Sequence, residues 1–193
     1  MNPLAVILYE DNRGAEKGFG LHALVLACVA DELGVEMFTL ARKLDGRPMN
    51  GVANLVRSCR RDIHRIAPHG QMVFALIDDD RVRDHLPGVD VPAGGEIVAR
   101  AIKSQSDAPE QLEVFLLVKN TETVIEAAKE CDRSLPDDAV AQALAKNLAQ
   151  RDRILNNVAR TGIRAVRDCI RGKVPALHQL VAALSAVVAA SPM

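Results

Sequence analysis

One stretch of the sequence, residues 74–80 (FALIDDD), constrains the fold more than any other. Four apolar residues run directly into Asp78, Asp79 and Asp80. An apolar run of this length that ends in charge is typical of a buried strand that reaches the surface. Three carboxylates at one strand end repel each other unless a cation lies between them. The sequence therefore predicts a strand end that holds a positive charge.

A second apolar stretch, residues 4–9, also ends in acids, namely Glu10 and Asp11. Ligands of an open parallel sheet bind outside the carboxyl ends of its strands. We therefore expect the two acidic strand ends to meet at one edge of a sheet and to hold a divalent metal ion there.

Strand geometry selects which of these acids share the metal. Side chains alternate along an extended chain, which points Asp78 and Asp80 the same way and Asp79 the other way. Together with Glu10, Asp78 and Asp80 would form an all-oxygen site suited to Mg²⁺ or Mn²⁺. The alternative is that these acids are solvated turn residues.

Strand and helix patterns alternate along the first part of the chain. Strands are predicted over residues 4–9, 35–40, 71–77 and 112–118, and helices over 19–33, 52–66, 96–104 and 121–131. The segment 42–50 contains Gly46 and Pro48 and indicates a loop. This alternation predicts an α/β fold with a mostly parallel, Rossmann-like sheet of four or more strands flanked by helices.

After Pro136 the pattern is helical only. This predicts an α/β domain over residues 1–132 and an all-helical extension over 133–193 that packs on it or mediates oligomerisation. The last helix, residues 174–190, is apolar nearly all round, although His178 and Gln179 interrupt it. It is slightly short for a membrane span, so we expect a buried helix, or one that binds a second copy or a protein partner, and no membrane insertion.

Charge gives only a local signal for nucleic acid binding. Lysine and arginine (24) nearly balance aspartate and glutamate (25), and aromatic residues make up 3%, which argues against base stacking. The polar face of the helix predicted over 52–66 carries Arg57, Arg60, Arg61 and Arg65, which could follow a phosphate backbone. A solvated amphipathic face explains the same pattern. The arginines between residues 153 and 171 leave the same alternatives open, as well as pairing with the acids of a partner.

The four cysteines, Cys28, Cys59, Cys131 and Cys169, form no CxxC pair, and each lies in an apolar helical pattern. Buried free thiols are therefore expected, with no disulfide. No basic segment precedes the first apolar run, so no signal peptide is predicted. Together these features predict a reducing, cytoplasmic location.

A glutamate directly after the first strand and an Asp-x-Asp after a later one resemble the TOPRIM domain of topoisomerases, primases and overcoming-lysogenization-defect nucleases. The resemblance covers about residues 4–130, with Glu10 at the family's glutamate and Asp78 and Asp80 at its Asp-x-Asp. It implies that these acids bind Mg²⁺, that Glu10 acts as a general acid or base, and that the chain cleaves DNA or RNA. A part in defence against foreign DNA is implied by the stand-alone members.

Two positions depart from the family pattern. Asp11 follows the glutamate where glycine is common, and Arg81-Val82-Arg83 follows the Asp-x-Asp where a glycine often comes soon after. The only tyrosine, Tyr9, lies inside the first strand, so it cannot serve as a tyrosine nucleophile in a separate domain. These departures favour a divergent, stand-alone TOPRIM-like protein over a topoisomerase or a primase.

Four other residues are weighed for the same site. Glu122 could be a further metal ligand or an ordinary acid in the first turn of a helix. Lys119, at the end of the fourth predicted strand, could contact a phosphate or be solvated, and Asp11 could add a carboxylate. His22, on the first helix, is expected to be structural rather than catalytic.

A second resemblance gives an alternative function. Residues 7–12 are similar to the acidic opening of response-regulator receiver domains, and Leu86-Pro87-Gly88 is similar to the loop after their phosphorylated aspartate. This resemblance implies a phosphoacceptor site. The distance in sequence from the opening acids to Asp78 is, however, longer than in that family. A third alternative is a non-catalytic protein that binds a partner through its last helix.

Overall fold

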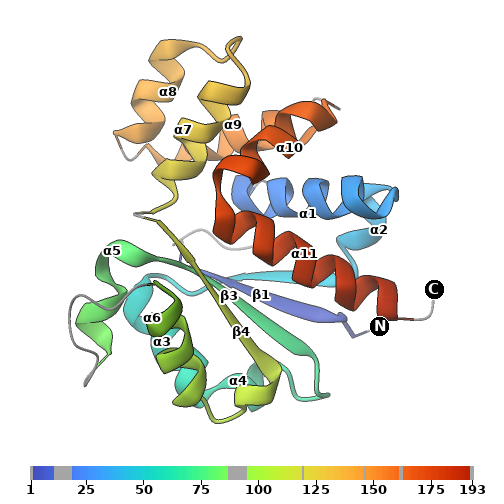
Figure 1. Cartoon of the computed structure of the whole chain (residues 1–193), viewed down its shortest axis with the longest axis vertical. Coiled ribbons are helices and arrows are strands. Elements are labelled where there is room, and N and C mark those ends of the chain that lie inside the picture. The colour runs from blue at the N-terminus through green and yellow to red at the C-terminus, as the bar shows by residue number, and fades with distance from the viewer. Residues whose placement is uncertain are drawn as a thin grey trace.

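The computed structural model of the chain describes residues 2–10, 19–86, 95–118, 120–145, 147–160 and 163–191, with Asp80 and Arg81 described in their backbone alone. Its centre is a sheet of four strands in which every neighbouring pair is parallel (Figure 1). The strands are β1 (Ala5–Tyr9), β2 (Leu44–Pro48), β3 (Met72–Asp78) and β4 (Leu112–Leu117), and they lie in the order β2-β1-β3-β4. This confirms the predicted α/β fold with a mostly parallel sheet.

The two central strands are the two that end in acids. Every residue of β1 is buried, and β3 is buried from Val73 to Ile77. Strands covered on both faces read as continuous apolar runs, which is why the sequence locates both. Tyr9 at the end of β1 lies opposite Leu76 of β3, so the two strands finish close to the same level.

The second strand is not where the sequence predicts it. The segment 35–40 lies largely in a short helix, α2 (Met37–Leu40), and leaves Val35 and Phe38 exposed. The strand is β2, which comes from the segment that the sequence indicates as a loop. As an edge strand, β2 pairs only with β1 and tolerates Pro48 at its end. The strand β2 is determined by backbone pairing with β1, and such pairing leaves no hydrophobic pattern in the sequence.

Gly46 lies in β2, although glycine is unusual inside a strand, because the first helix packs closely on this position. A Cβ at this position would lie 2.6 Å from Nδ1 of His22 on the first helix. Only glycine therefore allows the helix to pack this closely on the edge strand.

Helices cover both faces of the sheet. One face carries α1 (Gly20–Leu33) and α11 (Pro175–Ala190), and the other carries α3 (Val52–Arg61), α4 (Ile63–Ile66) and α6 (Gly95–Ser104) (Figure 1). Residues of β1 alternate between the two resulting cores: Ala5, Ile7 and Tyr9 belong to the first, and Val6 and Leu8 to the second. Three short helical turns, α5 (Asp79–Val82), η1 (Arg83–His85) and η2 (Pro109–Gln111), complete this part of the chain.

The helix predicted over 52–66 is divided into α3 and α4. Asp62, between them, has φ −123° and ψ 7°. Its carboxylate accepts a hydrogen bond from the Ser58 hydroxyl (3.1 Å), and the next N–H, of Ile63, donates to the carboxylate of Asp107 (3.2 Å). Side chains thus replace the continuous helical pattern at this point. As a result, Arg65 lies on α4, apart from the other three predicted basic residues.

The rest of the chain is helical, as predicted. After α7 (Glu122–Cys131) come α8 (Asp137–Leu144), α9 (Leu148–Arg160), α10 (Arg164–Lys173) and α11. The leucines and valines of α11 lie in the same core as β1 and α1, and the helix packs on β3 and β4. Its exposed positions include Pro175, His178 and Gln179, with several alanines. The apolar side of the last helix is therefore used inside the chain.

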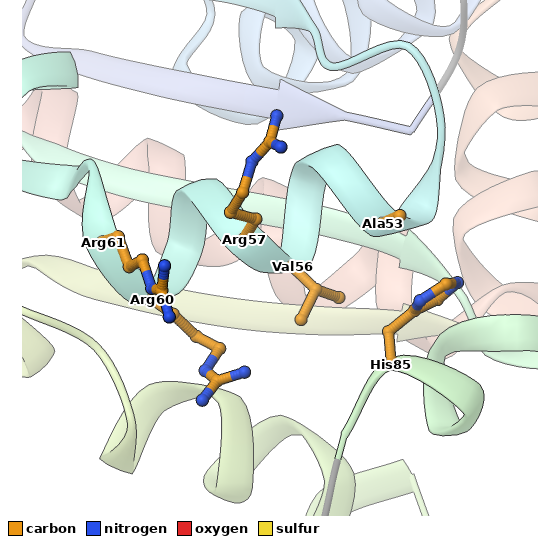
Figure 2. A pocket seen from close by; sticks show the side chains of 6 residues that line it. All are labelled: Ala53, Val56, Arg57, Arg60, Arg61 and His85. Carbon is orange, nitrogen blue, oxygen red and sulfur yellow. The ribbon is translucent and has the colours of Figure 1, made fainter.

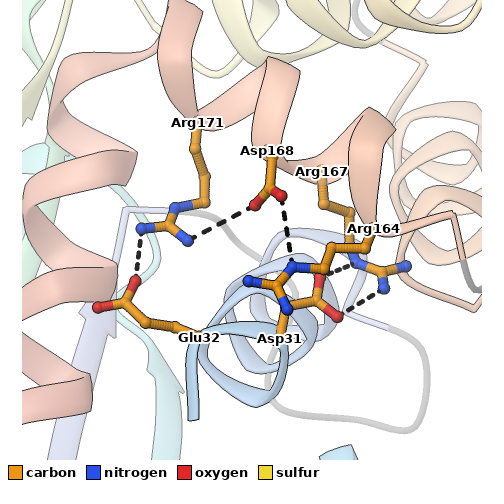
Figure 3. A network of polar contacts seen from close by, with 6 residues as sticks. All are labelled: Asp31, Glu32, Arg164, Arg167, Asp168 and Arg171. Atoms are coloured by element: carbon orange, nitrogen blue, oxygen red, sulfur yellow. Dashed lines mark hydrogen bonds and ion pairs between the residues drawn. The ribbon is translucent and has the colours of Figure 1, made fainter. Parts of the chain in front are cut away.

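Arginines of α10 attach it to α1 (Figure 3). Arg167 is buried and binds Asp31 with two nitrogens, at 2.5 and 2.8 Å, while its third nitrogen donates to two main-chain carbonyls of α9. Arg171 binds Glu32 at 2.5 Å and Asp168 at 3.8 Å. Hydrogen bonding to Asp31 raises the pKa of Arg167 above its usual value. The structure pairs Arg164, Arg167 and Arg171 with acids of the same chain, an outcome that is not among the alternatives left open by the sequence.

A disulfide corrects the prediction of four free thiols. Cys131, the last residue of α7, is bonded to Cys169 of α10, with their Cα atoms 5.8 Å apart. Cys28 and Cys59 are free and buried, as expected. The pair spans 38 residues and depends on the packing of α7 against α10, so the local sequence carries no sign of it. Disulfides persist mainly in oxidising compartments, which removes the basis on which a reducing, cytoplasmic location is predicted.

Among the described helices, none is by itself both long and apolar enough to cross a membrane. The consecutive helices α10 and α11 would suffice together, but the chain bends by 117° between them.

Candidate active site at the carboxyl edge of the sheet

The order of the strands defines where a ligand is expected. After β1 the chain continues into α1 on one face of the sheet, whereas after β3 it continues through α5 and η1 to α6 on the other face (Figure 1). Connections that leave neighbouring strands in opposite directions open a crevice at their carboxyl ends, which is the usual ligand site of such sheets. Glu10 and Asp78 stand at this point.

The structure brings Glu10 and Asp78 together. The main-chain N–H of Asp78 donates to Oε2 of Glu10 at 3.2 Å, and both side chains are half-buried. The carbonyl of Glu10 accepts a hydrogen bond of 2.7 Å from the N–H of Gly51, immediately before α3. The ends of three strands are thus tied to one another through Glu10.

Thr121 is a third member of this group. It lies between β4 and α7, and its hydroxyl donates to Oδ1 of Asp78 at 3.3 Å. The sequence predicts Thr121 only as the start of a helix. The signal that could have identified it as a site residue is a hydroxyl close to the carboxyl end of a parallel strand, where ligands bind.

The other acids after β3 are arranged differently from the prediction. The helical turn α5 begins at Asp79, so the extended chain stops at Asp78 and strand alternation does not relate Asp78 to Asp80. Asp79 pairs with Arg83 at 3.5 Å, which agrees with its expected separation from Asp78. The side chain of Asp80 lies outside the described residues, as do Asp11 and Lys119, and their assignment to the site stays a prediction.

Glu122 begins α7 and forms an ion pair with Arg151 of α9. Both side chains are largely buried, with exposed fractions of 17% and 11%. The N–H of Glu122 also donates to the side-chain oxygen of Asn120 at 3.1 Å. Arg151 neutralises this carboxylate within the chain, so its charge has an explanation that needs no metal ion.

The oxygen donors at the strand ends fit a hard cation. They are the carboxylates of Glu10 and Asp78 and the hydroxyl of Thr121, a set of the kind that Mg²⁺ and Mn²⁺ bind while keeping several waters. Within the described residues, no group of three His, Cys, Asp or Glu side chains is arranged to hold a metal ion. The described part of the chain therefore supplies two of the predicted carboxylates and one hydroxyl.

Three of the four predicted basic residues line a cavity. This cavity, of about 220 Å³, lies between α3 and η1 (Figure 2). It is lined by Ala53, Val56, Arg57, Arg60, Arg61 and His85. Arg65 is not among the lining residues and pairs with Asp62 at 3.3 Å. His85, which the sequence analysis does not single out, lies opposite Val56.

Buried Tyr9, the residue before Glu10, forms a pair with half-buried His22 of α1. The hydroxyl of Tyr9 lies 3.0 Å from Nδ1 of His22. Burial raises the pKa of Tyr9 and lowers that of His22 to about 4. Tyr9 therefore remains protonated and forms a hydrogen bond with a neutral imidazole, which agrees with the expected structural role of His22.

No family model and no curated protein match the chain. Among solved structures, it is similar to the C-terminal region of the OLD protein of Xanthomonas campestris pv. campestris, with 16% identity and a TM-score of 0.40. The match covers 94% of this chain and 97% of that chain. A likeness at this level carries no argument about the site, whose function rests on its own residues.

Proposed function

We propose that the chain is a Mg²⁺- or Mn²⁺-dependent phosphodiesterase that acts on nucleic acid. The observation that carries this proposal is the contact between Glu10 and Asp78 where the connections of two central strands diverge. The N–H of Asp78 holds the Glu10 carboxylate at the strand end from which the Asp78 carboxylate also projects, and carboxylates from neighbouring strand ends are donors of the kind that a hard cation binds. The resemblance of these acids to a TOPRIM motif supports the same reading.

Glu10 and Asp78 would hold the ion, with Thr121 and the predicted ligand Asp80 beside them. Bound there, the ion would stabilise charge on the phosphodiester and lower the pKa of a bound water. Glu10 accepts a proton from the attacking water. At the same time the water oxygen forms a bond to phosphorus, and the bond from phosphorus to the leaving oxygen breaks. The Asp78 N–H fixes the Glu10 carboxylate for this transfer, and the Thr121 hydroxyl orients Asp78.

The test is cleavage of labelled DNA and RNA in Mg²⁺ or Mn²⁺ by the wild type, Glu10→Gln and Asp78→Asn. Loss of a general base reduces rates by about a hundredfold or more, so Glu10→Gln should be nearly inactive. Asp78→Asn removes a carboxylate that would hold the ion and should be nearly inactive as well. Glu126→Gln is the matched control, because Glu126 is an exposed acid on α7. Equal activity of Glu10→Gln and the control would contradict the proposal, as would calorimetry that detects no binding of either ion.

The contact between Thr121 and Asp78 also favours a second candidate, a receiver-like phosphoacceptor. A hydroxyl beside the acceptor aspartate is a feature that this family implies, and the strand order β2-β1-β3-β4 agrees with a flavodoxin-like sheet. In this case Asp78 would bind beryllofluoride in the presence of Mg²⁺, and Asp78→Asn would not. Binding of beryllofluoride without any nuclease activity would favour this candidate over the first.

A further inference from the structure

The cavity between α3 and η1 brings several positive charges together. Of the six described residues that line it, three are arginines and one is a histidine, and none of these six is an aspartate or glutamate. Within the described chain, Arg57, Arg60 and Arg61 make no ion pair, and the one side-chain hydrogen bond among them joins Arg57 to the amide oxygen of Asn54. The Nε atom of Arg60 is buried and has no acceptor.

This arrangement is costly for the empty protein. Arg57 lies three residues before Arg60 and four before Arg61, spacings at which like charges destabilise a helix. The last turn of α3 favours positive charge at Arg60 and Arg61 through its partial negative charge. That effect lowers the repulsion but supplies no acceptor for the buried N–H of Arg60. An anion in the cavity would supply both the opposite charge and the acceptor.

The size of the cavity suits a small anion. A volume of about 220 Å³ has room for a phosphate group with a few waters. Guanidinium groups bind phosphate oxygens with two parallel hydrogen bonds, which makes arginine the preferred side chain for this ligand. Ala53 and Val56 supply the apolar part of the lining.

We infer that Arg57, Arg60, Arg61 and His85 form a binding site for a single phosphate group. Both elements that line it begin at the acidic edge: α3 follows Gly51, which is bonded to Glu10, and η1 follows the turn after Asp78. Arg57 is six residues beyond Gly51, or about 9 Å along a helix. A strand with one phosphate in this cavity could place another, two or three nucleotides away, at Glu10 and Asp78. This last step alone rests on the proposed function.

The proposal separates these arginines from the general basic surface. A diffuse patch would use Arg65 as much as Arg60, because both belong to the same basic segment. A discrete site uses Arg60, whose side chain lines the cavity, and not Arg65, which is exposed and pairs with Asp62. Arg65→Gln is therefore the matched control for Arg60→Gln.

The first measurement is the affinity of a fluorescent single-stranded oligonucleotide, with metal removed by chelator so that no cleavage occurs. Arg60→Gln should weaken binding about tenfold, the effect of losing a charge-assisted hydrogen bond. It should also reduce the slope of log affinity against log salt by about 0.7, the value for one phosphate contact on a single strand. Arg65→Gln should change the affinity less than about twofold. Equal losses in the two variants, or no loss in Arg60→Gln, would overturn the proposal.

The second measurement uses the wild type alone and does not depend on the variants folding. Inorganic phosphate, added at constant ionic strength, should shift the NMR signals of the Arg60 side chain and the His85 ring, whereas chloride should not. Unchanged signals would overturn the site. A mononucleotide that binds as tightly as the oligonucleotide would assign the phosphate to a free nucleotide, and weaker binding would assign it to a nucleic acid strand.

The two proposals can fail separately. Glu10→Gln should keep the full affinity for inorganic phosphate, since Glu10 does not line the cavity. A phosphate site without nuclease activity would contradict the proposed function alone, and nuclease activity with no effect of Arg60→Gln on affinity would contradict this inference alone.

Discussion

Helices α10 and α3 each carry three arginines, yet the structure uses them in opposite ways. In α10, Arg164, Arg167 and Arg171 all face carboxylates (Figure 3). In α3, the arginines that line the cavity have no ion pair among the described residues (Figure 2). The difference lies in the acids nearby: α1 presents Asp31 and Glu32 to α10, α10 itself carries Asp168, and no described acid lines the cavity beside α3.

This comparison shows how a structural arginine is distinguished from one that is available to a ligand. Arg167 has an acceptor for each of its nitrogens and lies in the interior, so its charge is used in packing α10 against α1 and α9. Arg60 has the same side chain, half-buried, with no acceptor at Nε. The tests below address each side of this comparison.

The largest effect is expected at the buried pair of α10. Arg167→Met should lower the free energy of unfolding by about 3–5 kcal/mol, because it leaves Asp31 buried without its partner. The side chains of Arg167 and Asp31 are only 6% and 15% exposed, so water cannot replace the lost contact. Urea unfolding followed by circular dichroism measures the change.

Two variants control this result. Arg164→Met removes an exposed pair on the same helix and should cost less than about 1 kcal/mol. The double change Arg167→Met with Asp31→Leu should recover most of the loss, since it leaves no unpaired charge. If the double variant were as unstable as the single one, the contacts of Arg167 with α9 would be the important ones.

The same comparison marks what the sequence can predict. Each helix carries three arginines within two turns, and two of the acids that pair with α10, Asp31 and Glu32, are more than a hundred residues away. Local pattern therefore predicts both basic faces and cannot say which is neutralised. The strands β1 and β3 are predictable because burial on both faces leaves an apolar run, whereas β2 depends on backbone pairing with β1.

The site follows the same division. Glu10 and Asp78 are predictable because both acids directly follow apolar strands whose ends meet in a parallel sheet. Thr121 is not, because its contact with Asp78 depends on the path of the chain after β4. The relation of Asp80 to Asp78 was argued from strand alternation, which ends where α5 begins.

A covalent bond holds α10 from the other side and gives the second largest effect. Replacing Cys131 and Cys169 by serine should cost up to about 4 kcal/mol, the loop-closure value for a separation of 38 residues. Reductant should destabilise the wild type by the same amount and leave the double variant unchanged. A thiol reagent added to the unfolded, unreduced protein should react only with Cys28 and Cys59. Reaction at all four cysteines would contradict the disulfide.

The third largest effect on stability is expected at His22. In contrast to the ion pairs of α10, His22 is a titratable group that lies in the folded protein in its neutral form. The pKa of His22 is about 4 in the folded protein and 6.5 as the ordinary value, so between these pH values only the unfolded chain takes up the proton. Stability is therefore complete above pH 6.5 and is lost as the pH falls towards 4. The expected loss between about pH 7 and about pH 5 is about 2 kcal/mol.

His22→Gln isolates this contribution. Glutamine can still accept the Tyr9 hydrogen bond and does not titrate, so the stability of the variant should change about 2 kcal/mol less over the same pH interval. Arg167→Met should keep the pH dependence of the wild type, since the arginine stays charged throughout. An unchanged pH profile in His22→Gln would mean that another group is responsible.

The smallest effect on stability is expected for Arg60→Gln. The change in stability is informative because it depends on whether phosphate is present. Without phosphate, Arg60→Gln should change stability by less than about 0.5 kcal/mol, because relief of like-charge repulsion opposes loss of the interaction with the helix end. At ten times its dissociation constant, phosphate should stabilise the wild type by about 1.4 kcal/mol through binding to the folded state. Phosphate also stabilises proteins in general by exclusion from their surfaces, an effect that the variant shares. The difference between the two proteins therefore measures the site alone, and equal gains in stability would place Arg60 with the solvated surface.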